Sequence, residues 1–323
     1  MRIERPLLRL PIRFCPDTLA REVGALPSDA WTPHPAKFDG NMAVPLVTPG
    51  GAITDECAGP MGPTEALGHC PYIAQIMREL DSTWGRSRLM SLEPGAVVPP
   101  HVDTHYYWRT HLRIHVPVIT NPKVSFTCAD ETVHMAAGEC WLLDSFFRHQ
   151  VENGGKEDRV HLVLDTVGSA RLWDLIEAAL AGADDEYVAP GDSRVRQLAF
   201  EQVNSPAVMS PWEMKAHIAY LFSWMDEDPR LAQVEKLLDR FVMTWNGSWA
   251  RFGTSDEGVP TYARHLQEIQ AELARFRRPP ILMRNGWPLL DSFHRFVLAN
   301  AIAPSRLRET PRTQADAPYR LTA

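Results

Sequence analysis

The sequence predicts a mainly β core followed by a helical second half. From about residue 86 to residue 167, short runs rich in β-branched and aromatic residues alternate with turn signals, a pattern typical of a barrel or sandwich. After Gly168 the apolar residues recur at helical spacing instead. We therefore expect two domains: residues 1–167, a β domain with N-terminal helices, and residues 168–323, a helical domain that ends in a mobile or docked tail.

The first half combines a few helices with many strands. Helical spacing predicts helices over 16–26 and 71–80, and the Gly- and Pro-rich stretch from 39 to 63 predicts a loop between them. The expected strands lie near 86–92, 97–104, 109–119, 123–128, 139–144 and 159–167.

The second half carries helix start and stop signals. Ser169 and Ser210 stand at expected N-cap positions, and Asn246-Gly247 is expected to end the helix that begins at Asp228. The predicted helices are 169–182, 210–225, 228–247, 261–277 and 289–301.

Composition excludes several classes of protein. A chain of 323 residues with 45% hydrophobic residues can bury a sizeable core, while a net charge of −7 without a basic block argues against nucleic-acid binding. Five cysteines without a C-x-x-C pair favour reduced thiols and a cytoplasmic location. The N-terminus is interrupted by Pro6 and Pro11, and we find no membrane-spanning segment. A homodimer is compatible with the sequence.

The segment "PPHVDTHYYWRTHLRIHVPV" concentrates imidazole and guanidinium groups. His101 and Asp103 are two residues apart on a predicted strand, so their side chains share a face. A non-haem Fe(II) site needs one more histidine from elsewhere in the barrel and leaves coordination positions open. His149, in "FFRHQVENGGKEDRVHLVLD", is the candidate.

A hairpin is expected after His149. A turn centred on Gly154 would place His149 opposite Arg159, with Cβ atoms about 5 Å apart. A charged, planar guanidinium beside a metal ligand suits a dicarboxylate that chelates iron at one end and forms a bidentate pair at the other. Such a cosubstrate would be 2-oxoglutarate.

Polar and apolar residues alternate along two of the predicted strands. In "RTHLRIHV" the arginines and histidines, including Arg113 and His115, occupy odd positions and aliphatic residues the even ones. The same alternation recurs from Arg159 to Asp165. A half-exposed strand is the simpler explanation, but two such strands around one ligand set favour a polar interior with an apolar exterior packed against helices. His134 and His161 lack a partner at ligand spacing and are expected to be structural.

The segments "LMSLEPGAVVPPHVD", "LRIHVPV" and "FTCADETVHMAAGECWLLDSFFRHQVENGGKEDRVHLVLD" resemble the aspartyl/asparaginyl β-hydroxylase family of Fe(II)- and 2-oxoglutarate-dependent oxygenases, which includes proline 3-hydroxylases. The resemblance covers about 86–167 and implies a double-stranded β-helix (jelly-roll, cupin-like) core. It also implies iron ligands at His101, Asp103 and His149 and a carboxylate contact at Arg159. Arg113 and His115 would line the same pocket.

Several features distinguish this chain from the animal members of the family. The animal enzymes lack the carboxylate ligand, whereas this chain has Asp103 and a helical second half, both closer to the proline 3-hydroxylase branch. A serine that contacts the cosubstrate in the animal enzymes falls near Met90 or Ser91 here, and Ser91 is the candidate.

The resemblance implies O2-dependent hydroxylation of an aliphatic carbon in an amino acid, either free and proline-like or peptide-bound. Candidate substrate contacts are Arg109 and Arg148, for a carboxylate, and Tyr107 and Trp108, for the pocket wall. Desaturation or cyclisation with the same cofactors is an alternative. Another is a non-catalytic, metal-binding cupin-like module, which would not need Arg159.

Overall fold

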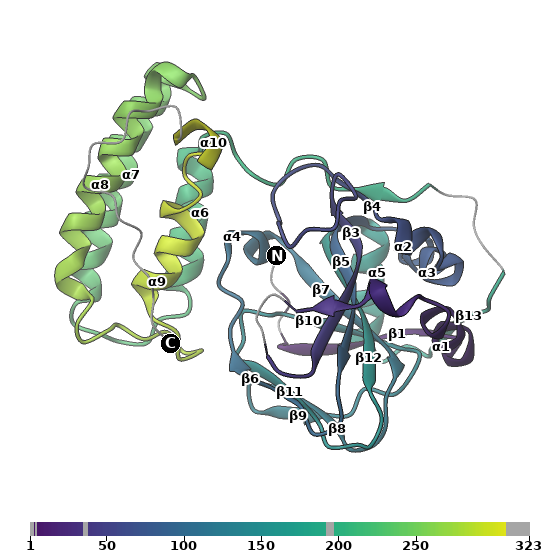
Figure 1. Ribbon diagram of the computed structural model, residues 1–323. Coiled ribbons are helices and arrows are strands. Elements are labelled where there is room, and N and C mark those ends of the chain that lie inside the picture. The colour runs from purple at the N-terminus through teal and green to yellow at the C-terminus, as the bar shows by residue number, and fades with distance from the viewer. Residues whose placement is uncertain (1–2, 4, 35–37, 192–196, 308–323) are drawn as a thin grey trace. The chain divides into compact units, whose positions relative to one another are not determined.

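The computed structural model describes residues 3, 5–34, 38–191 and 197–307. It divides into two compact units, Met1–Asn204 and a second that begins at Ser205 (Figure 1). This division lies later in the chain than the expected boundary at residue 167. The reason is that helix α5 (Ala170–Leu180) and strands β13 (Glu186–Val188) and β14 (Ala199–Phe200) pack within the first unit.

The first unit contains two β-sheets. The larger, ten-stranded sheet has the order β13-β1-β10-β7-β12-β5-β3-β2, with β14 beside β5 and β4 beside β3; the smaller has the order β6-β11-β8-β9. The large-sheet strands are β1 (Leu7–Phe14), β2 (Thr32–Pro33), β3 (Asn41–Pro49), β4 (Met61–Pro63), β5 (Thr83–Leu92), β7 (Leu112–Ile119), β10 (Glu139–Leu143), β12 (Arg159–Gly168), β13 (Glu186–Val188) and β14 (Ala199–Phe200). The small-sheet strands are β6 (Val97–His101), β8 (Val124–Cys128), β9 (Glu131–Val133) and β11 (His149–Asn153).

From β5 to β8, and again from β10 to β12, successive strands alternate between the two sheets. This winding gives the double-stranded β-helix that the resemblance implies, so the expected fold class is confirmed. Side chains from both sheets, such as Leu92 and Leu143 from the large one and Phe126 and Val151 from the small one, form one buried apolar cluster.

Helices cover the outer face of the large sheet. They are α1 (Pro16–Gly24), α2 (Glu65–Gly68), α3 (Pro71–Leu80) and α5. The main core joins Leu112, Ile114 and Val116 of β7 to Leu19 of α1 and Ile73 of α3. The predicted arrangement, apolar outside and polar inside, is therefore confirmed for this strand.

The predicted loop from 39 to 63 was wrong, because β3 and β4 lie within it. Pro45 falls at an irregularity in the β3–β5 register, and Pro11 falls at an irregularity between β1 and β10. A proline has no N–H to donate, so it is tolerated in a sheet where the ladder is interrupted. Pro11 and Pro45 therefore explain why β1 and β3 were not predicted from the sequence.

The predicted hairpin between His149 and Arg159 was also wrong. His149 pairs with His101 and Cys128 in the small sheet, whereas Arg159 pairs with Leu92 in the large one. The chain crosses from one sheet to the other at the turn after Asn153, so the two strands do not form a ladder.

The second unit is helical. It contains α6 (Pro211–Phe222), α7 (Leu231–Phe252), α8 (Val259–Leu273), α9 (Leu289–Phe293) with a π-helical continuation over His294–Leu298, and α10 (Pro304–Leu307). The hydroxyls of Ser169 and Ser210 accept from the backbone N–H groups of Leu172 (3.0 Å) and Glu213 (3.2 Å), which confirms both caps.

Helix α7 continues through Gly247 instead of ending there. Trp245, fully buried, donates to the Met209 carbonyl at 2.9 Å. This packing outweighs the cost of a helical glycine, about 1 kcal/mol. Within the described residues, no helix has the length and apolar character needed to cross a bilayer. Most of the predicted C-terminal tail lies outside the described residues.

Candidate active site

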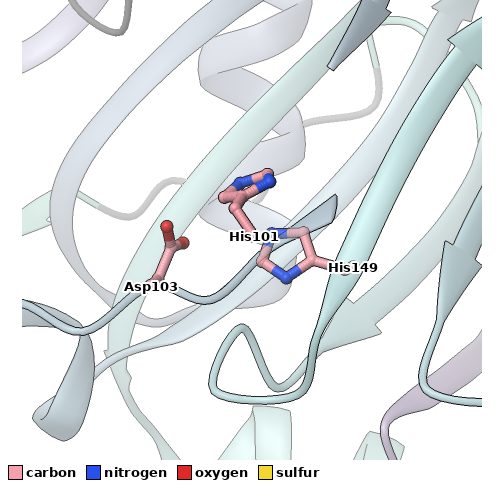
Figure 2. Close-up of side chains that lie close together, drawn as sticks. All are labelled: His101, Asp103 and His149. Atoms are coloured by element: carbon pink, nitrogen blue, oxygen red, sulfur yellow. The ribbon is translucent and has the colours of Figure 1, made fainter. Parts of the chain in front are cut away.

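Three potential metal ligands converge at one end of the small sheet. Figure 2 shows His101 at the end of β6, Asp103 just after it and His149 at the start of β11. One ligand atom from each lies within 4.8 Å of the other two. His101 and His149 are cross-strand neighbours with ring centroids 4.2 Å apart, so the antiparallel ladder itself brings the two imidazoles together.

The backbone orients both imidazole rings. Nδ1 of His101 lies 2.8 Å from the Pro99 carbonyl, and Nδ1 of His149 lies 2.9 Å from the Phe147 carbonyl. A carbonyl can only accept, so Nδ1 donates and Nε2 keeps its lone pair. This is the arrangement in which a histidine is fixed as a metal ligand.

A half-buried arginine holds the carboxylate ligand. Arg113 donates from NH1 to Asp103 at 2.9 Å, and from Nε and NH2 to the two oxygens of Asp165 at 2.8 and 3.1 Å. Burial opposes ionisation of Asp103, but the charge of Arg113 holds the pKa of this carboxyl below its ordinary value. Burial lowers the pKa of His149 to about 4.

The donor set therefore presents two imidazoles and one carboxylate. This combination, with its ligand atoms on one side, fits a facial Fe(II) site that leaves other coordination positions free.

A second cluster surrounds Arg159. Its NH2 lies 2.6 Å from Nδ1 of His161, which in turn lies 3.5 Å from Nδ1 of His115. Burial lowers the pKa of Arg159 to about 9, which leaves it charged at neutral pH. Burial, with the charge of Arg159, pushes the pKa values of both histidines well below their usual range. His161 thus supports Arg159, a role that its spacing did not suggest.

Arg159 has an unused buried donor. Its Nε has no hydrogen-bond partner, and no carboxylate pairs with its guanidinium anywhere in the described ranges. A buried charge of this kind is costly unless an anion accompanies it. The cluster is therefore suited to hold a carboxylate.

One cavity of about 310 Å³ joins the two clusters. It is lined by His34, Phe38, Asn41, Arg86, Arg88, Met90, Leu92, Val98, His101, Asp103, Trp108, Arg113, His115, Phe126, Leu143, His149, Val151 and Arg159. The ligand triad and Arg159 therefore face the same space from different sheets.

Sequence reasoning missed His34, Asn41, Arg86 and Arg88. The sequence did contain a pattern that points to the two arginines. Arg86, Arg88 and Met90 occupy every second position of β5, so their side chains share the face that lines the cavity.

Of the other candidate site residues, some line the cavity and others lie elsewhere. Trp108 lines the cavity, as do Arg113 and His115. Tyr107 belongs instead to the main core. Ser91 is buried on β5 but is absent from the lining to which its neighbours Met90 and Leu92 contribute, because successive side chains alternate between faces.

Neither candidate carboxylate-binding arginine contributes to the cavity lining. Arg109 lies in the short helix α4 (Tyr106–Thr110), where a strand was expected. Arg148 is exposed.

A buried network of hydrogen bonds and ring stacking joins His111, Tyr107 and Glu201 to strand β5, which contributes to the cavity wall. Nε2 of His111 lies 3.1 Å from a Glu201 carboxylate oxygen and Nδ1 lies 2.6 Å from the Tyr107 carbonyl, so both nitrogens face acceptors. His111 stacks on Tyr107 with centroids 3.7 Å apart, and the Tyr107 hydroxyl accepts from the Arg86 backbone N–H at 2.6 Å. A Cβ at Gly85 would lie 2.3 Å from that hydroxyl, so only glycine allows this approach.

We expect Glu201→Gln to lower the free energy of unfolding by about 1–3 kcal/mol, because a charged partner of buried His111 is replaced by a neutral amide. Urea unfolding would measure this effect. Glu177→Gln, an exposed change on α5, is the matched control and should unfold like the wild type. Equal stability of the two variants would show that the pair contributes nothing.

Comparisons with known proteins give the chain's relatives. A family model described as aspartyl/asparaginyl beta-hydroxylase matches residues 58–168. L-proline cis-4-hydroxylase of Rhizobium meliloti (strain 1021) is 31% identical over 196 residues, covering 54% of this chain and 70% of that protein.

Two solved structures share part of the fold. An oxidoreductase of the 2OG-Fe(II) oxygenase family from Burkholderia pseudomallei is 14% identical with a TM-score of 0.40, over 51% of this chain and 86% of that one. A Pseudomonas putida prolyl-4-hydroxylase is 14% identical with a TM-score of 0.36, over 50% and 92%. The sequence relationship above, and not these distant likenesses, defines the family.

The β-helix and the sequence relationship together define a 2-oxoglutarate-dependent oxygenase. More particularly, the chain belongs to the aspartyl/asparaginyl β-hydroxylase family, as the resemblance implied, and it is a hydroxylase.

Proposed function

We propose that this protein hydroxylates an aliphatic carbon of a small amino acid or a close derivative, using Fe(II), 2-oxoglutarate and O2. The observation that supports this proposal most strongly is the shared cavity. Its wall carries the two imidazoles and one carboxylate at one place, and at another the guanidinium of Arg159, which has no carboxylate partner among the described residues.

In this proposal His101, Asp103 and His149 hold the iron, and Arg113 fixes Asp103 in position. Arg159, supported by His161 and His115, binds the distal carboxylate of 2-oxoglutarate. Bound iron would supply the oxidising chemistry, driven by decarboxylation of the cosubstrate. The protein's own residues orient the reactants and exclude water.

The substrate class rests on size and on the relative. A cavity of about 310 Å³ lies at the lower end of the range for ligand sites, about 300–1,000 Å³, and suits a small molecule. The curated relative is an L-proline hydroxylase, which supports an amino-acid substrate. A non-catalytic cupin-like module would have no use for the buried charge of Arg159, so we favour the enzyme.

Anaerobic titration of the metal-free protein with Fe(II) and 2-oxoglutarate tests the proposal. We expect the weak visible charge-transfer band of the chelate in the wild type and its loss in His149→Ala. His134→Ala, which removes a histidine outside the cavity lining, is the control and should keep the band. If bound iron gave no band with 2-oxoglutarate in the wild type, the proposal would be wrong.

A further inference from the structure

The cavity wall carries more positive than negative charge. Among the residues that the structure describes, four guanidinium groups line it against a single carboxylate, that of Asp103. Arg113 is already paired with Asp103 and Asp165, and in the proposed function Arg159 is used by 2-oxoglutarate. Arg86 and Arg88 therefore remain to contact the substrate in the cavity.

Neither of these two arginines has a carboxylate partner in the part of the chain that the structure describes. Arg86 donates from NH1 to the Asp55 backbone carbonyl at 3.1 Å. Burial, together with the charges of Arg86 and Arg113, lowers the pKa of Arg88 to about 9, and Arg88 is still charged at neutral pH. Buried charges are usually compensated, so this region calls for an anion.

The unused hydrogen-bonding groups here are donors. Nε of Arg86 and Nε1 of Trp108 are buried and without a partner among the described residues. The guanidinium of Arg86 also lies over the Trp108 ring, 5.2 Å from its centroid, which places the two donors on the same part of the wall. A ligand that satisfies them must bring acceptors.

A free amino group fits this wall poorly. An ammonium group carries three donors and a positive charge, and it would need a carboxylate or several other acceptors. Among the described residues that line the cavity, only Asp103 offers a carboxylate, and it is held by Arg113 and assigned to the metal. Acylation removes the positive charge and adds a carbonyl acceptor, which Trp108 Nε1 can meet.

We propose that the substrate is a net anion whose nitrogen is acylated: a small N-acyl amino acid, with its carboxylate toward Arg86 and Arg88 and its acyl oxygen toward Trp108. This inference rests on the proposed function and specifies its substrate class.

Three probes separate charge from acylation: N-acetyl-L-proline is an anion, L-proline is a zwitterion, and N-acetyl-L-prolinamide is neutral. Initial rates of succinate formation would be measured with the full-length protein, Fe(II) and 2-oxoglutarate. We expect kcat/KM for N-acetyl-L-proline to exceed the values for both other probes by about tenfold or more, the effect of one charged hydrogen-bonded contact.

Two substitutions test the assigned contacts. Arg88→Gln should lower kcat/KM for N-acetyl-L-proline by about tenfold or more. Trp108→Phe removes the indole N–H and should reduce the preference for N-acetyl-L-proline over L-proline. Arg21→Gln, an exposed change on α1, is the control.

An L-proline value equal to or above that of N-acetyl-L-proline would overturn the inference. So would failure of all three probes to stimulate succinate formation by a protein that still forms the iron chelate. Failure of the proposed function itself would look different, because the chelate band would then be missing before any probe is added.

Discussion

Replacing Arg159 with methionine is expected to raise the 2-oxoglutarate concentration needed for half-maximal turnover by about 100-fold, or about 3 kcal/mol. Arg159 is a buried guanidinium that faces the cavity without a carboxylate partner in the described chain. Iron binding should survive, because the two histidine ligands lie in the other sheet and Asp103 lies just after one of its strands. Succinate formation at increasing 2-oxoglutarate concentrations gives the first quantity, and Fe(II) titration gives the second.

Arg159→Lys keeps the charge but loses the planar fork, so it should fall between the wild type and Arg159→Met. The exposed Arg21→Gln change is again the control. Unchanged 2-oxoglutarate dependence in Arg159→Met would remove this residue from the cosubstrate site.

Replacing Arg113 with methionine is expected to lower the free energy of unfolding by about 3–5 kcal/mol, because buried Asp165 and half-buried Asp103 would lose their shared partner. The pKa of Asp103 should rise at the same time, since the charge of Arg113 holds it low. Weaker Fe(II) binding should follow. Urea unfolding of the metal-free protein and Fe(II) titration would measure the two effects.

The double variant Arg113→Met/Asp165→Asn tests the cause of the destabilisation. If the cost arises from unpaired buried carboxylates, neutralising Asp165 should recover part of the stability lost in Arg113→Met. A double variant at least as unstable as the single one would instead assign the cost to packing.

Local spacing predicted much of the candidate site. His101 and Asp103 were expected on one face of a single strand; β6 ends at His101 and Asp103 lies just after it, but their ligand atoms still lie together. The alternation along β7 correctly placed Arg113 and His115 toward the interior. The Ser169 and Ser210 caps are also local, because each hydroxyl needs only a backbone N–H three residues away.

Features that depend on the pairing of distant segments could not be predicted in the same way. The predicted hairpin would have placed His149 beside Arg159 on a neighbouring strand. Both residues do reach the cavity, but they come from opposing sheets. The alternation of Arg86 and Arg88 along β5 shows that they share one face, but which segment that face meets depends on the pairing of distant strands. Glu201 meets His111 only after the chain returns to pair β14 with β5.

The placement of the metal ligands in one sheet and of Arg159 in the other has a consequence for cosubstrate selection. The separation of the two sheets, kept by the apolar cluster that includes Phe126, Leu143 and Val151, sets the distance between the chelating end and the distal carboxylate of any acid bound in the proposed way. Because packed cores deform little, this distance is nearly fixed. The enzyme should therefore discriminate among 2-oxo diacids by chain length, and the homologues of 2-oxoglutarate with one carbon fewer or one carbon more should support turnover poorly.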